Sequence, residues 1–405
     1  MSTQAQTAFA LAPAAQKQRS LRANADRALK VSAGFWFVVV VLGELAFAFS
    51  VGSFYGANAL RGSWRHWNRT MTHGYDPARP MGNVVVAIHL TAAVLILLSG
   101  ALQLIPFIQR RAPRLHRWNG RVYMVTAFAV SLAGLYMLWF RGSVGGFLPH
   151  VAQSIDAVLI MVCAIMALRY ALARSFKAHR RWALRLFIAV SASLFIRAGF
   201  FLVALFPGGF DAASFTGPLL TYLSFGQYLV PLAILEVYFR VQERAGARGR
   251  FAMAAGLFLA TLALGAGIVM VTMVSFVPTI KRAYDSRQSI ADTLSSTIAS
   301  QGIDEAAQQY REVKAASPAS YNFDEDELNT LGYELIKNRQ YQQAVRIFQL
   351  NTEAYPHSSN TWDSLGEAYM DAGDQADAVT FYRKSLEINP KNGNAVKMLQ
   401  KLNTN

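Results

Sequence analysis

The chain has 405 residues, of which 53% are hydrophobic and only 16% charged, a composition that excludes an ordinary soluble protein. Its net charge of +15 originates in residues 1–278, because residues 279–405 contain 13 Lys and Arg against 17 Asp and Glu, so the basic excess indicates membrane orientation and no nucleic-acid partner. Cys163 is the one cysteine, which excludes a disulfide framework and a Cys-x-x-Cys-His motif for covalent haem attachment.

Seven apolar runs are long enough to cross a bilayer. A hydrocarbon core about 30 Å thick requires about 20 residues of helix, and helix is the structure that satisfies every backbone polar group of an isolated run in lipid. The runs cover residues 31–55, 83–107, 121–140, 148–171, 183–206, 219–239 and 251–277. The sequence therefore predicts an all-α fold in which residues 31–278 form a seven-helix polytopic membrane bundle.

Lys and Arg residues mark one side of this bundle. They are concentrated in a polar leader, residues 1–30, and in the loops after the second, fourth and sixth runs, whereas residues 141–149 contain a single Arg. Residues 61–79, with four Arg, are the exception. Because positive loops stay in the cytoplasm, we predict a cytoplasmic leader that acts as a signal anchor in a bacterial inner membrane, and an extracytoplasmic C-terminus. A transit peptide is the alternative interpretation of the leader.

Polar residues within the runs are candidates for function, because lipid disfavours them. Glu44, near the middle of the first run, has a functional role or stays protonated and hydrogen-bonded within the bundle. Asp156 and Arg197 lie at similar depths, about 12 Å and 14 Å from the outer ends of their runs by helical rise, so we expect them to pair, or Arg197 to meet a ligand carboxylate. Gln103 and Glu236 lie toward the cytoplasmic ends of their runs.

Four consecutive runs, within residues 83–207, each have one histidine near an end. If neighbouring runs alternate in direction, His89 and His150 lie toward the outer face, and His116 and His179 toward the inner face. Facing imidazoles at one depth suit bis-histidine haem ligation, so the pattern predicts up to two b-type haems with these pairs as iron ligands. For His116 and His179, an interfacial structural role beside Arg and Trp is the alternative. Zinc fits less well, because no two of these histidines are three or four residues apart.

Haem propionates require cations, and arginines accompany the histidines. Arg117, Arg121 and Arg181 lie beside the inner pair, and Arg197 lies in the same half of the membrane as the outer pair. We therefore predict that these four arginines help to bind the cofactor.

The arrangement resembles the ascorbate-reducible transmembrane di-haem cytochrome b family. In that family four consecutive helices each supply one histidine, with pairs that here correspond to His89 with His150 and His116 with His179. The string Leu-His-x-Trp-x-Gly at residues 115–120 is similar to the third-span motif of the family. The resemblance implies electron transfer across the membrane to an external acceptor such as a ferric chelate, or electron exchange with quinone.

A second resemblance implies no activity. The strings His-Arg-Trp-x-Gly-Arg-x-Tyr at 116–123 and His-Arg-Arg-Trp at 179–182 resemble a family of predicted bacterial membrane proteins of unknown function, over most of the membrane part. Two functions without haem therefore stay open: a membrane scaffold that recruits a protein partner, and a small-molecule transporter that uses Glu44, Asp156 and Arg197. The sequence predicts no catalytic residue and leaves open whether the protein is an enzyme.

After Pro278 the composition changes, and a period of 34 residues begins. The pairs at this spacing are Leu331-Gly332 with Leu365-Gly366, Ala344-Val345 with Ala378-Val379, Phe348 with Tyr382, and Pro356 with Pro390. The pattern resembles the tetratricopeptide repeat, which implies a short helical solenoid with repeats over residues 325–405. Residues 279–324 are predicted to be a linker and a degenerate first repeat. Such solenoids bind peptides or proteins, so we predict a docking site, with self-association or stabilisation as the alternative.

Overall fold

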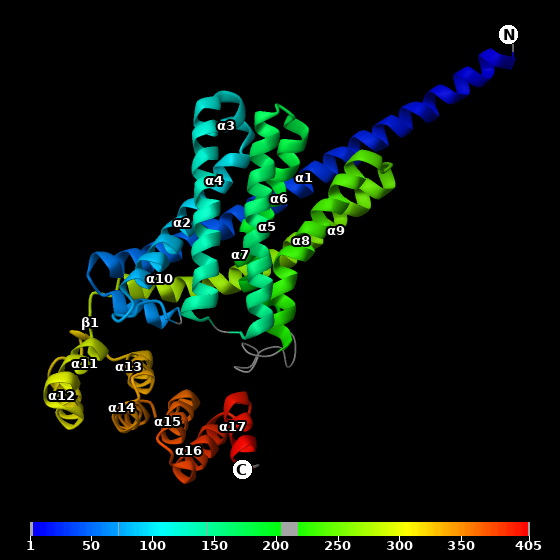
Figure 1. Cartoon of the computed structure of the whole chain (residues 1–405). Helices are drawn as coiled ribbons and strands as arrows, with labels where there is room; N and C mark the ends of the chain where they lie inside the picture. Colours follow the sequence, from blue (N-terminus) through cyan, green and yellow to red (C-terminus); the bar gives the residue numbers. More distant parts are fainter. Residues whose placement is uncertain (1–2, 72, 144, 204–217, 404–405) are drawn as a thin grey trace. The chain divides into compact units, whose positions relative to one another are not determined.

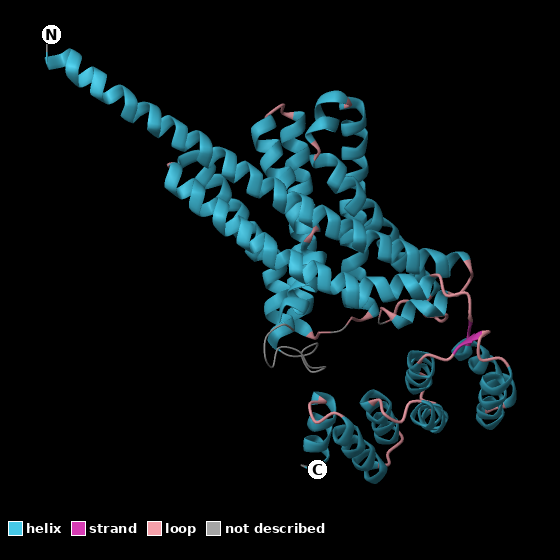
Figure 2. Ribbon diagram, turned by 180° about the vertical axis from the view of Figure 1, so that it is seen from behind, coloured by secondary structure: helices cyan, strands magenta, loops and turns pink. Residues whose placement is uncertain are grey.

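The computed structural model of the protein describes residues 3–71, 73–143, 145–203 and 218–403. These residues form two compact units, the first ending at Tyr284 and the second beginning at Asp285. Helices make up nearly all of both units (Figure 1, Figure 2). The prediction of an all-α fold class is confirmed.

Six helices of the first unit are long and apolar enough to cross a membrane, among the described residues. They are α1 Thr3–Leu60, α2 Pro80–Leu104, α4 Pro113–Tyr136, α5 Phe147–Leu172, α8 Pro218–Arg244 and α9 Ala247–Val271. Helices α6 (Phe176–Val190) and α7 (Ala192–Val203) meet at 49° and make a seventh span if they count as one. The predicted seven spans therefore become six or seven, because the run at 183–206 is a broken helix pair.

The break between α6 and α7 has a local cause. The Ser191 hydroxyl lies 2.8 Å from the carbonyl oxygen of Phe187, one turn earlier, and also contacts the carboxyl group of Glu44 on α1. A serine hydroxyl that returns to the carbonyl of the preceding turn competes with the helix ladder and bends the helix. The break therefore places a buried carboxyl group of one helix against the bend of another.

Helix boundaries differ from the predicted ones at both ends of the membrane unit. The leader and the first apolar run belong to one helix, α1, because the leader contains many Ala, Gln and Arg residues, which favour helix. After α9 the helix continues through a π-helical segment, η4 (Thr272–Phe276), into α10 (Val277–Ala283). The remaining short elements are η1 Trp64–Arg69, α3 Pro106–Arg111 and η2 Met137–Arg141.

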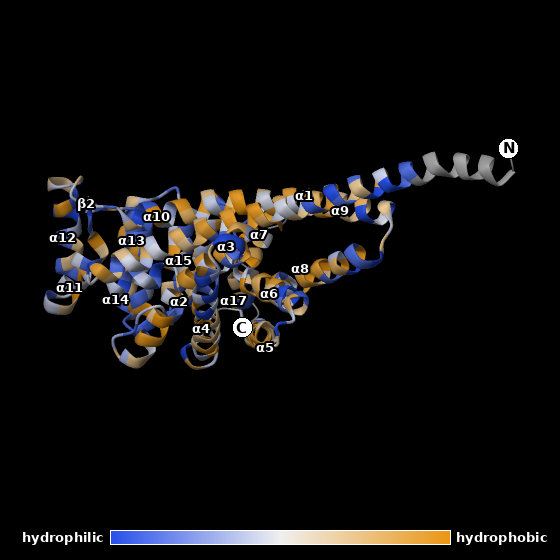
Figure 3. Ribbon diagram, turned by 90° about the horizontal axis from the view of Figure 1, so that it is seen from above, coloured by the Kyte–Doolittle hydropathy of each residue, from blue (hydrophilic) through white to orange (hydrophobic). Residues whose placement is uncertain are grey.

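Close packing of the membrane helices depends on small residues. Helix α1 packs along α9, α2 against α4, and α5 against α6. A methyl group added at Gly267 would lie 2.6 Å from the carbonyl oxygen of Ala198, and one added at Gly43 would lie 2.9 Å from Leu194. Such positions let helix backbones approach closely in lipid. Large hydrophobic side chains are exposed on α5, α8 and α9, among them Ile155, Leu229 and Leu259, and much of the ribbon of α5 and α8 is coloured as hydrophobic (Figure 3).

The second unit consists, as described, of three helix pairs, a last helix and one pair of short strands. The elements are β1 Gln288–Ser289, α11 Ile290–Gln301, α12 Ile303–Ala316, β2 Tyr321–Asn322, α13 Glu325–Lys337, α14 Tyr341–Ala354, α15 Ser359–Asp371, α16 Gln375–Ile388 and α17 Gly393–Asn403. Strands β1 and β2 are parallel, with Gln288 opposite Tyr321. The predicted degenerate repeat lies over α11 and α12.

The 34-residue period has a packing cause. A methyl group added at Gly332 would lie 2.4 Å from the Phe348 ring, and one added at Gly366 would lie 3.0 Å from the Tyr382 ring. Glycine on the first helix of each pair therefore lets an aromatic ring of the second helix rest against its backbone. Helices α11, α13, α15 and α17 are called the A-helix layer below, and α12, α14 and α16 the B-helix layer.

Candidate functional site

The two outer histidines contact different parts of α4 and its extension. His89 on α2 places Nδ1 3.1 Å from the carbonyl oxygen of Val130. His150, in the first turn of α5, has its ring centroid 5.9 Å from that of Trp139, and its Nε2 is buried without a hydrogen-bond partner in the described part of the chain. No hydrogen bond or ring contact joins these two described imidazoles.

The two inner histidines each link neighbouring helices. Nδ1 of His179 lies 2.8 Å from the carbonyl oxygen of Ala167, which ties α6 to α5. The Gln103 amide nitrogen donates to His116 Nδ1 at 2.7 Å when the amide oxygen accepts from the Gly120 N–H at 3.0 Å. The opposite amide orientation places the Gln103 oxygen against acceptors only. Gln103 and His116 therefore link the ends of α2 and α4.

Two of the three arginines predicted beside the inner histidines have protein partners. The guanidinium group of Arg121 lies 4.7 Å from the ring centroid of Trp118. Arg181 forms an ion pair with Glu243 at 2.6 Å, which joins α6 to α8. Arg117 is exposed near the start of α4. These contacts are sufficient to account for Arg121 and Arg181 without a bound anion.

The prediction that Asp156 pairs with Arg197 is wrong. The Arg197 guanidinium group lies 4.4 Å from the ring centroid of Phe47 and donates to the carbonyl oxygen of Ser193 at 2.6 Å. Asp156 is 8% exposed, and its Oδ1 has no hydrogen-bond partner among the described residues. The two residues have similar depths, but depth does not determine the direction in which a helical side chain points.

The other two membrane carboxyl groups have neighbours on different helices. Glu44 is 1% exposed; its Oε1 contacts the Ser191 hydroxyl, and its Oε2 has no hydrogen-bond partner in the part of the chain that the structure describes. Glu236 on α8 pairs with Arg185 on α6 at 2.6 Å. Glu44 therefore lies at the helix break, whereas Glu236 closes the contact between two spans.

No group of three His, Cys, Asp or Glu side chains gathers as a metal-ligand set among the described residues. Bis-histidine haem ligation requires only two imidazoles, so this finding does not test the haem prediction.

The repeat domain contains a polar row that the sequence motifs did not point to. Its members, called the A-layer seam, are Asn329 and Tyr333 on α13, Asp363, Ser364, Glu367 and Asp371 on α15, and Asn394 on α17. The Tyr333 hydroxyl donates to Glu367 at 2.9 Å, and Asn394 donates to Asp363 Oδ2 at 2.8 Å. The seam therefore joins three helices of the A-helix layer. The sequence did contain one signal for this seam, because the acids on α15 are spaced four residues apart.

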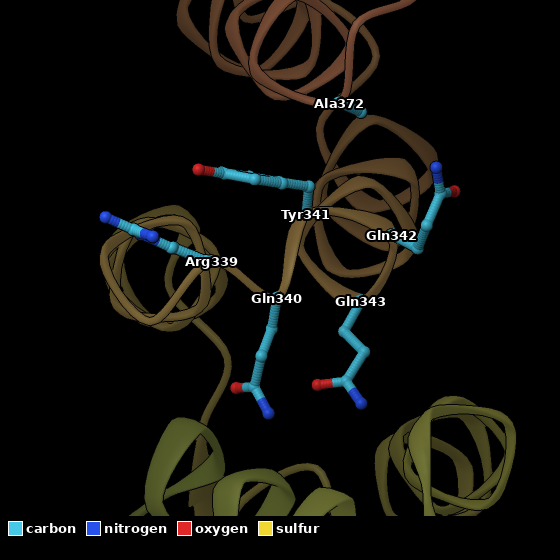
Figure 4. Close-up of a pocket in the computed structure, with 6 residues that line it drawn as sticks. All are labelled: Arg339, Gln340, Tyr341, Gln342, Gln343 and Ala372. Carbon is cyan, nitrogen blue, oxygen red and sulfur yellow. The ribbon is translucent and has the colours of Figure 1, made fainter.

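A shallow hollow of about 330 Å³ lies at the turn between α13 and α14. Arg339, Gln340, Tyr341, Gln342, Gln343 and Ala372 line it (Figure 4). The side chains of Gln340 and Gln343 extend to the same side, away from Tyr341 (Figure 4). The hollow has mixed polarity and no charged cluster, so the A-layer seam is the stronger candidate site.

Comparison with known proteins finds a family model that matches each part of the chain. Residues 86–239 match the model of a family described as "Predicted membrane protein (DUF2306)", and residues 359–392 match the tetratricopeptide repeat. The chain is also 38% identical over 60 residues to "Superkiller complex protein 3" of Homo sapiens, a match that covers 15% of this chain and 4% of that protein. These findings confirm the resemblance to predicted membrane proteins, and the cytochrome b resemblance stays a prediction. Residues 86–239 are thus similar to the DUF2306 family of predicted membrane proteins, and residues 359–392 are similar to a tetratricopeptide repeat.

Proposed function

We propose that the protein is a membrane-anchored docking protein whose repeat domain binds a peptide segment of a protein partner. The observation that carries this proposal is the A-layer seam, in which polar side chains of three successive helices meet on one layer. Tyr333, one member of the seam, remains 36% exposed. Tyrosine combines a large apolar contact area with a hydroxyl group at low entropic cost, which favours partner binding.

The helices also favour docking because they present these groups on a rigid support. The Ser364 hydroxyl donates to Asn329 at 3.0 Å, so the side chains of α13 and α15 hold one another in place before any partner arrives. Preorganised side chains lose little entropy on binding. The Lys and Arg distribution of the loops supports a cytoplasmic N-terminus and an extracytoplasmic repeat domain in a bacterial inner membrane, so we expect the partner to be extracytoplasmic.

Site-specific photocrosslinking in cells tests the docking proposal. A benzophenone side chain at Tyr333 is expected to form one dominant adduct, and a control at Thr380, exposed on the B-helix layer, is not. A peptide from the captured protein, added to the purified full-length chain, is then expected to compete for the site. Equal adducts at both positions, or no competition, would exclude docking at this layer.

One b-type haem between His89 and His150 is a second candidate function. A ligating histidine usually donates its other ring N–H to a carbonyl oxygen, and His89 has this arrangement with Val130, which leaves Nε2 available. The buried Nε2 of His150 also lacks a hydrogen-bond partner in the described structure. When bound, haem would supply one-electron chemistry toward an acceptor such as quinone or a ferric chelate.

The inner pair fits haem less well. A Gln103 amide that donates to His116 Nδ1 leaves the proton of the neutral imidazole on Nε2, where it blocks metal ligation. Arg181 is also engaged by Glu243 and is not available to a propionate. We therefore reduce the sequence prediction of up to two haems to one, and favour the alternative structural role for His116 and His179.

A dithionite-reduced minus oxidised spectrum of the purified protein tests this candidate. We expect one b-type haem per chain, lost in His89→Ala and retained in His116→Ala. Protein made with ample haem supply that contains no haem would exclude electron transfer and leave docking as the function.

A further inference from the structure

Four exposed arginines gather without acids where α2, α3 and α4 meet. Helix α3 follows α2 directly and contacts the start of α4 (Figure 1). The arginines define what is called the α3–α4 corner below, and they are Arg110, Arg111, Arg114 and Arg117. Residues 77–155 contain no Asp or Glu, and none of the four arginines forms an ion pair among the described residues. The α3–α4 corner therefore has four positive charges that no described acid matches.

The basic start of α6 is the opposite case. Lys177 and Arg181 form ion pairs with Glu243 at 2.8 Å and 2.6 Å, and Arg185 pairs with Glu236 at 2.6 Å. Orientation in the membrane depends on Lys and Arg in both loops, and acids contribute little to it. Orientation alone therefore does not explain why acids match one basic cluster and not the other. The difference favours an anionic partner from outside the chain at the α3–α4 corner.

An exposed apolar face of α4 continues from the corner toward the centre of the membrane. Because a helix turns by about 100° per residue, positions 114, 118, 121, 125 and 132 fall within about 60° of one another. On this face Trp118, Val125 and Leu132 are 64%, 69% and 58% exposed. Tryptophan is enriched at the level of lipid headgroups. Arg114 therefore lies at the headgroup end of a face that is exposed to lipid acyl chains.

Contacts within the chain hold the corner in place. Pro106 and Pro113 lie in the first turns of α3 and α4, where proline is favoured. The Gln109 side chain donates to the carbonyl oxygen of Gln103 at 2.9 Å, which ties α3 to the end of α2. On α3 itself, Phe107 is 70% exposed. The corner therefore presents its arginines beside an exposed aromatic ring on a fixed backbone.

We propose that the α3–α4 corner binds the phosphate groups of anionic phospholipids in the bilayer. Guanidinium groups match phosphate oxygens in a bidentate geometry, and basic clusters beside a membrane helix attract anionic lipid. The acyl chains of the same lipid then lie along Val125 and Leu132, which are exposed on the face below. A water-soluble phosphate has no group to place on that face, so the structure favours lipid. This inference is independent of the docking function proposed for the repeat domain.

Quenching of tryptophan fluorescence by brominated lipids tests the inference, because Trp118 lies on the same face as Arg114 and bromine quenches only at short range. The full-length protein is placed in phosphatidylcholine vesicles that contain either brominated phosphatidylglycerol or brominated phosphatidylcholine. The Trp118 signal is the difference between each protein and the same protein with Trp118→Phe. We expect phosphatidylglycerol to be preferred about fivefold at Trp118, and the preference to fall as salt is added.

The decisive variant removes the four charges of the corner together, by Arg110→Gln, Arg111→Gln, Arg114→Gln and Arg117→Gln. We expect the two lipids then to quench Trp118 about equally. The matched control removes four exposed charges elsewhere in the membrane domain, by Arg180→Gln, Arg240→Gln, Arg244→Gln and Arg248→Gln, and is expected to retain the preference. The four corresponding Arg→Lys substitutions in the corner keep the charges and are expected to retain about half of the preference or more.

Equal quenching by the two lipids in the wild-type protein would overturn the inference and leave the arginines with a role in membrane orientation alone. A preference that the lysine substitutions abolish as fully as the glutamine substitutions would also overturn it, because charge would then not be the cause. A preference that inorganic phosphate removes at constant ionic strength would identify a site for a free phosphate anion and exclude the assignment to lipid.

Discussion

Helix α6 of the membrane domain and helix α15 of the repeat domain differ in how their charges are matched. In the membrane domain, Arg185 and Arg181 on α6 form ion pairs with Glu236 and Glu243 on α8, so these charges of one helix are matched by another. In the repeat domain, the acids of α15 repel one another, and Glu367 has a tyrosine hydroxyl as its closest partner. Charges that the fold matches internally hold helices together. Like charges that the fold leaves on one helix face repel one another, at a small cost in stability.

The largest expected effect is in the membrane domain, at Arg141. This residue is 6% exposed and donates to the Asn83 side chain at 2.7 Å and to the carbonyl oxygens of Gly74 and His73. Arg141→Met removes the donor to these three oxygens, of which Asn83 Oδ1 keeps the Asp76 N–H, so we expect a loss of about 3 kcal/mol in unfolding free energy. The unfolding temperature in detergent measures it. Arg114→Met, at an exposed residue, is the control and should not change it.

The pair of Arg185 and Glu236 is expected to show a smaller effect. Its side chains are 22% and 37% exposed, so solvent screens the attraction. A double-mutant cycle with Arg185→Met and Glu236→Gln should give a coupling energy of about 1 kcal/mol, measured by unfolding in detergent. A coupling energy near zero would mean that matched charges in this domain do not hold helices together, and the contrast between the units would fail.

Long apolar helices were predictable from the sequence because lipid admits few other structures. The break at Ser191 was not, since the serine hydroxyl contacts Glu44, which is 147 residues away in the chain. Histidine positions along their helices were also predictable. Their partners were not, because the neighbour of His89 depends on how α2 is rotated against α4, which the spacing of histidines does not report.

The repeat domain shows the same limit. Its period predicted the helix pairs, because Gly332 and Gly366 recur where an aromatic ring must pack. The A-layer seam was not predicted, although the acids of α15 were visible at their four-residue spacing. A helix pattern shows which residues share a face, but only the packing of α13 and α17 against that face shows which charges remain uncompensated.

In contrast to the membrane variants, removing a charge from the row of acids on α15 should stabilise the protein. Glu367→Gln relieves repulsion from Asp363 and Asp371 and keeps an acceptor for Tyr333, so we expect a gain of a few tenths of a kcal/mol. Slower hydrogen exchange of α15 amides in the full-length chain measures it. Faster exchange of these amides would show that the Glu367 charge stabilises the fold.

The pH dependence of the repeat domain gives the smallest and most specific effect. Asp363 and Glu367 have raised pKa values in the folded chain, so the folded state binds more protons than the unfolded state above about pH 4, the ordinary carboxyl pKa. Stability from these groups is therefore complete below that value and is lost as pH rises through the raised pKa values. After correction for intrinsic exchange rates, α15 should be better protected at pH 5 than at pH 7. In Asp363→Asn with Glu367→Gln the difference should shrink. An acid-labile α15 would instead mean that cations of the chain itself stabilise the row as carboxylates.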